Sequence, residues 1–341
     1  MKPPRRWVDA PMSNPVRILS RASAPPGERP GSPTRPLADG DILRRRSQSR
    51  RARRETFFGY VMVAPALVVV VVFTIAPILA SFVLGLFKWD AISSPQFVGL
   101  DNFDALLHDK AVTHSLLVTS GLAVMIVVLQ VALGLGLALL VAQRASKIVQ
   151  NLFRAAFFLP MLASAASISI VMSYMFNDQF GVINYYLDLL HLPQVSWLSS
   201  TGGATATIVL VAVWQQLGFT FILFVAALGS LPVDVLEAAQ IDGATSARMF
   251  WRIKLPLISP TLLFASTVGL INTMQLFDQP YVMTKGGPGD STYTTVLLVY
   301  QTAFQNLQFG YASAISVVLF VVLLVITAVQ FTVSRKWVFY S

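Results

Sequence analysis

The chain has 341 residues, of which 55% are hydrophobic and only 12% are charged, and its mean hydropathy is +0.65. A soluble domain normally carries about a quarter charged residues, so this chain cannot cover a surface that faces water on all sides. Cysteine does not occur in it, which excludes a disulfide framework, a thiolate nucleophile and a cysteine-ligated metal. The composition therefore predicts an integral membrane protein.

The first 55 residues carry the whole net charge of +9, with 14 Lys and Arg against 5 acidic residues, whereas the other 286 residues hold 11 of each. They are rich in Pro, Ser and Arg, and predict a disordered cytoplasmic tail, 1–55, before a membrane domain, 56–341. Its arginine-dense stretch 44–54 favours contact with anionic lipid over docking to nucleic acid or protein, and nucleic acid is not an expected partner. A cleaved signal peptide is not expected, because the first apolar run starts near residue 57 and is too long.

Six apolar runs follow the tail, each of roughly 20 residues or more, which is enough to cross a hydrocarbon core of about 30 Å as a helix. They lie at 58–87, 115–142, 155–176, 205–229, 260–283 and 312–334. The predicted fold is therefore an all-α integral membrane protein with about six transmembrane helices.

Positive charge predicts the direction of these spans. With the N-terminus inside, the inner segments hold 22 Lys and Arg, and the outer segments hold only Lys88, Lys110 and Lys285. Without the tail the ratio is still 8 to 3. Because Lys and Arg concentrate on the cytoplasmic side, both termini are predicted to be cytoplasmic.

Several spans carry amide or carboxylate side chains, Gln130 among them, where lipid contact would favour leucine. Such groups must face other helices or a water-lined path, and helix–helix hydrogen bonding is the alternative to pathway lining for each of them. Asn272, Gln275 and Gln279 are spaced to share one face of the fifth span, which favours a pathway there. The predicted pathway residues are Trp214, Gln215, Gln216, Asn272, Gln275 and Asp278.

The inner loop between the fourth and fifth spans predicts a short helix, a glycine break and a second short helix. Ser230 is expected to cap the first helix, with Pro232 in its first turn. Gly243 suits a left-handed helix terminus, and Pro256 and Pro260 redirect the chain before the fifth span. The loop should therefore form a compact knob that a soluble partner could move.

This loop carries a long motif, made of Glu237-Ala238-Ala239, Asp242-Gly243-Ala244, Ile253 and Leu255-Pro256. The motif resembles the EAA loop of the permease subunits of binding-protein-dependent ABC importers. The resemblance implies that the loop is a coupling helix pair that docks on an ATP-hydrolysing subunit. In that picture Glu237 meets a basic residue of the ATPase, Gly243 permits the turn, and Phe250 and Ile253 anchor the loop to the membrane domain.

Further matches resemble the carbohydrate-uptake branch of that family, which includes permeases for maltose, other oligosaccharides and glycerol-3-phosphate. They are Phe97 to Phe103, Trp214, Thr284-Lys285-Gly286-Gly287-Pro288, Phe304 and Gly310-Tyr311-Ala312, and the resemblance spans roughly residues 57–341. It implies a bacterial inner-membrane importer with two ABC ATPase subunits, a second non-identical permease and an extracytoplasmic solute-binding protein, which would contact Lys285, Gly286, Gly287 and Pro288. The spans offer amides and aromatic rings without a buried Lys or Arg, which favours a neutral carbohydrate over a glycerophosphate.

The chain has no Gly-x-x-x-x-Gly-Lys-Ser/Thr phosphate loop, and its Gly286–Gly289 segment lacks the Lys and Ser/Thr that would follow. No catalytic residue, metal site or cofactor is therefore expected in this chain, and ATP and Mg would be bound by the partner ATPases. A secondary transporter driven by an ion gradient is the alternative; it requires buried acids, and the spans offer only Asp278. A membrane enzyme is weaker still, because His108, His114 and His191 lie outside the spans or at their edges.

Overall fold

The computed structural model describes residues 58–144 and 147–338, so the predicted 1–55 tail lies outside the described residues. The chain divides into two compact units, Met1–Val68 and Val69–Ser341. The elements described below belong to the second unit unless stated otherwise. One helix, Phe58–Leu84, runs across this division; its second part comprises a π-helical turn, η1 (Val71–Ile75), and α2 (Ala76–Leu84).

Within residues 58–144 and 147–338, four helices are long and apolar enough to cross a membrane, and two further bent helix pairs bring the number to six if each pair is one span. The four are Phe58–Leu84, Lys110–Val141 within α4 (Lys110–Arg144), α8 (Thr201–Gly229) and α14 (Phe309–Ser334). The prediction of a helical membrane protein is confirmed, although two of the six predicted spans are not single straight helices.

The third predicted span, 155–176, is bent between α5 (Lys147–Leu162) and α6 (Ala165–Met175), whose axes meet at 106°. Pro160 lies inside α5 and cannot donate to the helix ladder, and Ser164 takes an extended ψ of 132° that ends the helical path. The bend follows from these two residues.

The fifth predicted span is also interrupted. Its helix α12 (Ser259–Met274) is preceded by the helical segment Ser246–Leu257, which meets it at 66°, and it ends at Met274 rather than near residue 283. After a non-helical stretch, the chain resumes as a π-helical turn, η3 (Pro280–Thr284).

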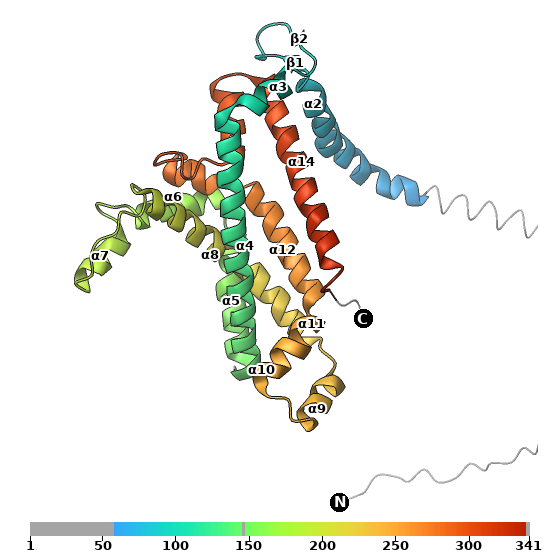
Figure 1. Cartoon of the computed structure of the whole chain (residues 1–341), viewed down its shortest axis with the longest axis vertical. Helices are drawn as coiled ribbons and strands as arrows, with labels where there is room; N and C mark the ends of the chain where they lie inside the picture. The colour runs from blue at the N-terminus through green and yellow to red at the C-terminus, as the bar shows by residue number, and fades with distance from the viewer. Residues whose placement is uncertain (1–57, 145–146, 339–341) are drawn as a thin grey trace, which may run out of the picture. The chain divides into compact units, whose positions relative to one another are not determined.

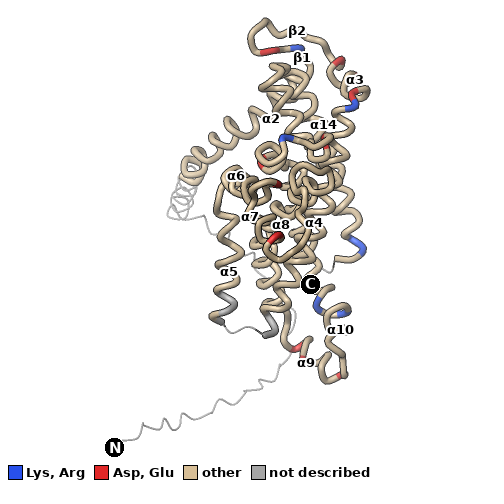
Figure 2. Tube along the Cα trace, turned by 90° about the vertical axis from the view of Figure 1, so that its left-hand side faces the viewer, with Lys and Arg blue, Asp and Glu red and all other residues tan. Residues whose placement is uncertain are grey.

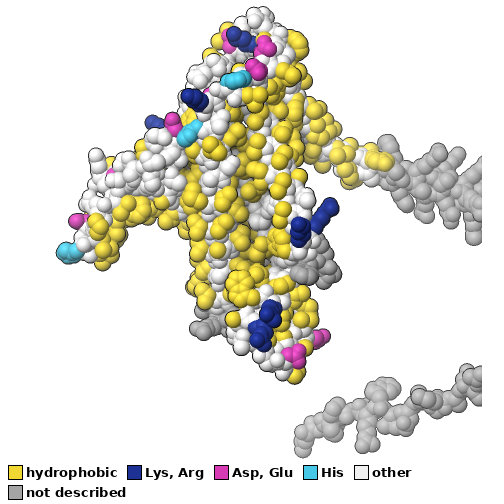
Figure 3. Space-filling model, in the orientation of Figure 1, with side chains coloured by type: hydrophobic (Ala, Val, Ile, Leu, Met, Phe, Trp, Pro, Cys, Tyr) yellow, Lys and Arg dark blue, Asp and Glu magenta, His cyan; other side chains and the backbone are white. Residues whose placement is uncertain are grey.

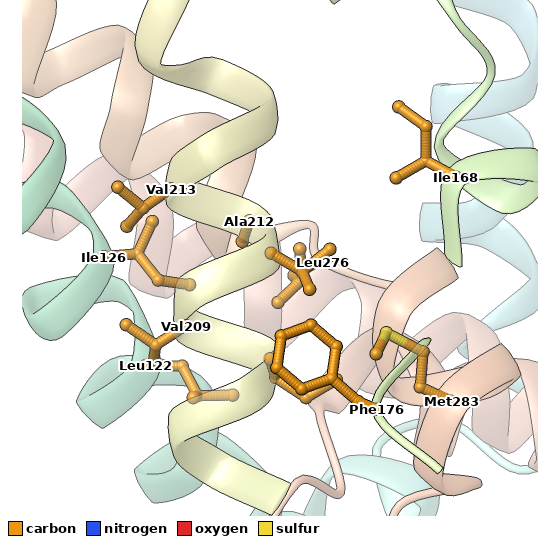
Figure 4. Close-up of a cluster of buried hydrophobic side chains, with 11 residues drawn as sticks. Leu122, Ile126, Ile168, Phe176, Val209, Ala212, Val213, Leu276 and Met283 are labelled. Carbon is orange, nitrogen blue, oxygen red and sulfur yellow. The ribbon is translucent and has the colours of Figure 1, made fainter. Parts of the chain in front are cut away.

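The core of this unit forms where α4 and α8 pack side by side, with α12 and α5 against them (Figure 1). Figure 4 shows one buried cluster, in which α4 side chains meet those of α8 and of the stretch around Leu276 and Met283. Close approach depends on small residues: a Cβ on Gly134 of α4 would lie 2.8 Å from the Thr220 methyl of α8. In a bilayer, such backbone proximity and hydrogen bonding drive helix association.

A cap of short elements covers one end of this helical layer (Figure 1). It contains a two-stranded antiparallel hairpin of two residues per strand, in which Phe87 pairs with Phe97, within the otherwise helical fold. The Asn102 side chain donates to the carbonyls of Gly85 and Phe87 at 2.8 and 3.0 Å and ties the hairpin to its flanking helices. The short elements of the cap are β1 (Phe87–Lys88), β2 (Gln96–Phe97), α3 (Asp101–His108), α13 (Thr295–Tyr300) and η4 (Gln301–Gln305). Another short helix, α7 (Val182–Leu189), lies away from the cap and contacts α6 (Figure 1).

Charge is segregated along the layer. Charged side chains gather around the hairpin end and around the α9–α10 end, where α9 is Val233–Ile241 and α10 is Ser246–Met249, and mostly hydrophobic side chains cover the helices between (Figures 2 and 3). A surface with an apolar band between two polar ends is what a bilayer requires.

Candidate functional site

The segment between α8 and α12 forms the helix–glycine–helix turn that the sequence predicts. Helix α9 ends at Asp242, and Gly243 follows at φ +75°. The Gly243 amide donates to the Gln240 carbonyl at 3.0 Å and the Ala244 amide to the Ala239 carbonyl at 2.9 Å. This pair of bonds is a Schellman motif, which requires a left-handed residue at the position of Gly243.

The second helix of the turn continues directly toward the membrane span. The Thr245 hydroxyl caps α10 by accepting from the Arg248 amide at 3.4 Å, and α10 runs through η2 (Phe250–Lys254) into α11 (Leu255–Leu257). Phe250, Leu255 and Leu257 pack against a buried cluster of α4 and α8 side chains that includes Phe221 and Phe224. The turn is therefore joined mechanically to the helical layer. We define Pro232–Pro256 as the loop knob.

The predicted coupling residues divide by exposure. Glu237, Ala238, Asp242 and Gly243 are exposed, whereas Ala239 is buried. The remaining members are half-buried: Ala244, Phe250, Ile253, Leu255 and Pro256. A cavity of about 420 Å³ opens beside them, lined in part by Gln240, Ala244 and Met249. The knob thus offers an exposed face on α9 and an anchored face on η2 and α11.

One capping prediction for this segment is wrong. The residue before α9 is Pro232, which has no side-chain cap, while the Ser230 hydroxyl donates back to the Ala227 carbonyl at 2.9 Å. Ser230 closes the end of α8 because two residues, Leu231 and Pro232, still separate it from α9.

A second polar site lies within the helical layer, where α8 meets the stretch after α12. Gln215 on α8 and Gln279 are both buried, and the Gln279 Nε2 donates to the Gln215 Oε1 at 2.8 Å. The Oε1 of Gln216, the next residue along α8, is buried and has no hydrogen-bond partner among the described residues. Unsatisfied buried amides are costly, so this carbonyl oxygen is available to a ligand or water.

The expectation that Asn272, Gln275 and Gln279 share a helix face is wrong, because α12 ends at Met274. Gln275 is the C-cap residue at φ −103°, and the Leu276 amide donates to the Thr273 carbonyl at 3.0 Å in a tight turn. As a result Asn272 and Gln275 are exposed, Asp278 is half-buried and Gln279 is buried. Of the predicted pathway residues, Gln215 therefore lies at the interrupted helix through its bond to Gln279, whereas the half-buried Trp214 packs against an apolar cluster.

Interrupted helices at membrane depth occur where the freed backbone groups are satisfied by protein or line a water-filled cavity. Here the Thr294 hydroxyl donates to the freed Leu276 carbonyl at 2.9 Å. Thr294 is a residue that sequence reasoning did not select, because its role depends on a contact across 18 positions of the chain.

A third polar contact joins α4 to α8. Gln130 is 2% exposed and donates through Nε2 to the Thr220 Oγ1 at 2.6 Å, while its own Oε1 finds no hydrogen-bond partner within residues 58–144 and 147–338. A Cβ at Gly269 of α12 would lie 3.3 Å from that oxygen. Gln130 therefore forms a hydrogen bond between two helices, which is the alternative to pathway lining for a buried amide in a span.

The loop from Thr284 to Thr294 is held by its own hydrogen bonds. Lys285, Gly286 and Gly289 have positive φ, and the Gly287–Pro288 peptide is cis. The Thr292 Oγ1 donates to the Gly287 carbonyl at 3.1 Å, and a Cβ at Gly286 would lie 2.6 Å from the Tyr293 ring. Lys285 is exposed at its tip, while Gly286 is buried and Gly287 and Pro288 are half-buried.

The comparisons with known proteins agree with these features. The family model described as "Binding-protein-dependent transport system inner membrane component" matches residues 130–338. An sn-glycerol-3-phosphate transport system permease protein of Agrobacterium fabrum is 35% identical over 288 residues, covering 83% of this chain and 96% of the relative. A trehalose/maltose transport system permease protein of Thermococcus litoralis is 34% identical over 290 residues, covering 84% and 97%.

A solved bacterial ABC transporter involved in the import of the acidic polysaccharide alginate contains a chain with the same fold, at a TM-score of 0.73 and 23% identity, covering 85% of this chain and 99% of that one. The chain belongs to the binding-protein-dependent transport system inner membrane components. It is thus a multi-pass inner-membrane permease subunit of an ABC importer, and its family implies that partner ATPases bind the ATP.

The amide pair supplies a prediction of its own. Replacing Gln279 by leucine is expected to lower the thermal stability of the purified permease, because it leaves the Gln215 Oε1 buried and unpaired, at a cost of about 1–3 kcal/mol. A double replacement of Gln215 and Gln279 by leucine should recover part of this loss. Melting curves in detergent measure the effect, and strictly additive losses would contradict a direct bond.

Proposed function

We propose that this chain is one of two non-identical permease subunits of an importer for a neutral carbohydrate or a related solute, with both termini in the cytoplasm. Two ATPase subunits would drive it through the loop knob, and an extracytoplasmic binding protein would deliver the solute. The proposal rests first on the knob: an exposed acidic α9 face, a Gly243 turn and an anchored second helix form one lever attached to α4 and α8.

The direction of force transfer follows from these contacts. A partner that moves α9 pulls on Gly243, and the Schellman bonds transmit the movement to α10. Because α10 continues through η2 and α11, the movement reaches the junction with α12 and the Phe221–Phe224 region of α8. Glu237 is an exposed acid on α9, and we assign it the contact with a basic residue of an ATPase.

The solute path is proposed to pass the break after α12 and to continue past Gln216 on α8. Gln215, Gln275 and Asp278 supply hydrogen-bonding groups at the break. Two relatives are named as transport system permeases for trehalose/maltose and for sn-glycerol-3-phosphate. Lys285 to Pro288 would meet the binding protein. Their loop touches α4 near its start, where the Asp290 carbonyl lies 3.1 Å from the His114 Nε2, whereas the knob adjoins Leu139 near the other end of α4. The 1–55 tail is proposed to rest on anionic lipid at the cytoplasmic face.

Co-purification tests the assembly. The tagged chain, extracted from its native host in mild detergent, should carry an ATPase subunit and a second multi-pass permease, and a binding protein after crosslinking, each identifiable by mass spectrometry. Recovery of the chain alone or as a homodimer, even after crosslinking at the knob, would contradict the proposal.

Charge reversal at Glu237 tests the docking face. Glu237→Lys is expected to lower ATP-dependent uptake about tenfold or more. It replaces the proposed pair of opposite charges, Glu237 and a basic residue of the ATPase, by two positive charges in a buried contact. Asp234→Lys changes another exposed acid on α9; it is the matched control and should have a smaller effect. Equal losses for both variants would show that general charge on α9, rather than Glu237, makes the contact.

A further inference from the structure

Six aromatic rings follow one another from the break after α12 to the turn after β1. The centroids of successive rings lie 5.0, 5.1, 5.4, 5.8 and 6.0 Å apart in the order Phe277, Tyr281, Tyr300, Phe304, Phe309 and Trp89. The Phe277 ring also lies 5.1 Å from the Tyr300 ring. We call these six residues the aromatic row. The members come from separate segments, so only the tertiary fold creates the row.

The row is not a buried core. Phe304 is 63% exposed, and its five companions are half-buried rather than buried. Rings that only hold a core together would exclude solvent, as Phe221 and Phe224 do at 0% exposure. The row is also not purely apolar, because a hydrogen bond with Tyr281 raises the pKa of Tyr300, so two hydroxyl groups meet within it.

A polar cavity of about 720 Å³ lies at the Trp89 end of the row. Its lining offers many hydrogen-bonding groups, including Asp90, Gln96, Asn102, Asn306 and Gln308. Trp89 is fixed in its wall, because the ring Nε1 donates to the Ser93 carbonyl at 3.0 Å and the Trp89 carbonyl accepts from the Gly310 amide at 3.3 Å. The cavity is therefore a shaped site with an aromatic wall.

The charge of the cavity bears on its ligand. Lys88, Asp90 and Asp101 all line it, two carboxylates against one ammonium group. Hydrogen bonds from the Ser93 amide and hydroxyl and the Ile92 amide hold the pKa of Asp90 below its ordinary value. A cavity with this excess of negative charge disfavours a phosphate or carboxylate ligand and favours a neutral one.

The other end of the row lies beside the predicted pathway. Phe277 stacks on Tyr281 with an angle of 14° between the ring planes, next in sequence to the half-buried Asp278 and the Gln279–Gln215 pair. A solute that leaves the Trp89 cavity along the row would reach amide and carboxylate groups at the break after α12.

A sugar ring matches this surface, because its C–H face is apolar and its rim carries hydroxyl groups. Aromatic faces have negative charge density that attracts the C–H face, and neighbouring amides and carboxylates can take the hydroxyls. We propose that the Trp89 cavity receives a neutral oligosaccharide and that the aromatic row guides it to the break after α12. This inference rests on the proposed carbohydrate import and adds the receiving site and its route.

The test uses a native host that lacks the chain and is complemented with variants, so that all partner subunits are present. Uptake of radiolabelled maltose, trehalose and sn-glycerol 3-phosphate is measured over a range of concentrations. Phe304→Leu and Tyr300→Leu are expected to raise KM about three- to tenfold for a transported sugar, because each removes one stacking face. Phe304→Tyr keeps the face and should behave like the wild type, as should Tyr186→Leu, an exposed ring on α7 outside the row.

The outcomes separate this inference from the proposed function. If the wild type takes up none of the three solutes in an ATP-dependent manner, the proposed function fails, and the inference about the aromatic row fails with it. If a sugar is transported but Phe304→Leu and Tyr300→Leu leave KM unchanged, the row is not a route and only this inference fails. Transport of sn-glycerol 3-phosphate alone, or loss of the second permease from the purified Phe304→Leu complex, would also overturn it.

Discussion

Gly243→Val is expected to lower ATP-driven uptake about 5- to 30-fold while leaving the permease inserted in the membrane. Gly243 has φ +75°, a conformation that costs an ordinary residue about 1–2 kcal/mol and a β-branched residue more. A penalty of that size reduces the population of the intact turn by a factor of about 5–30. Among the described residues, and apart from the two chain neighbours of Gly243, no atom lies within 4 Å of a Cβ at this position, so the effect is one of backbone conformation.

Gly243→Asn is the matched control for this prediction. Asparagine tolerates the left-handed conformation, so the Schellman bonds from residues 243 and 244 should persist and uptake should stay within about threefold of the wild type. Uptake and the ATPase activity stimulated by the binding protein are both measured, along with the amount of permease in the membrane. Wild-type uptake in the valine variant would show that the loop knob does not transmit the movement.

Gly218→Ala is expected to have the largest effect on stability. A Cβ at Gly218 of α8 would lie 1.9 Å from the Phe157 carbonyl oxygen and 2.5 Å from its carbon, both of them backbone atoms of α5. Backbone cannot rotate away as a side chain can, so α5 and α8 must separate, at a cost of about 1–3 kcal/mol or more. The purified permease should melt at a lower temperature, and less of it should accumulate in the membrane.

Gly136→Ala is the matched control, because it makes the same glycine-to-alanine replacement within a helix, on α4. In the part of the chain that the structure describes, no atom outside the local helix backbone lies within 4 Å of a Cβ at Gly136. Alanine favours a helix over glycine by about 0.5–1 kcal/mol. This variant should therefore melt at or above the wild-type temperature. Equal melting temperatures for Gly218→Ala and the wild type would mean that α5 and α8 do not approach as closely as the structure has them.

Hydropathy and charge predicted the membrane class and the positions of the straight spans. The predicted runs 205–229 and 312–334 lie within α8 (Thr201–Gly229) and α14 (Phe309–Ser334). Local signals also predicted the helix–glycine–helix turn, because Gly243 and the flanking proline residues act through the backbone of their own neighbourhood.

The two broken spans were not predicted, for a physical reason. Apolar composition continues through Leu276 and Phe277, so hydropathy carries the fifth span past Met274, where the helix ends. Pro160 is tolerated in membrane helices and does not by itself reveal a 106° bend. The Gln215–Gln279 bond and the aromatic row depend on which segments meet in space, and a single sequence carries no record of such contacts.

Reconstitution tests the central claim that energy enters through partner ATPases at the loop knob. The complex purified from its native host is placed in liposomes with ATP inside, and uptake of radiolabelled sugar delivered by the binding protein is followed with and without ionophores. Uptake that requires internal ATP and persists when proton and sodium gradients are collapsed is the predicted result. Uptake that proceeds without ATP and stops with the ionophores would contradict the account and point instead to a gradient-driven carrier, with Asp278 as the first residue to replace.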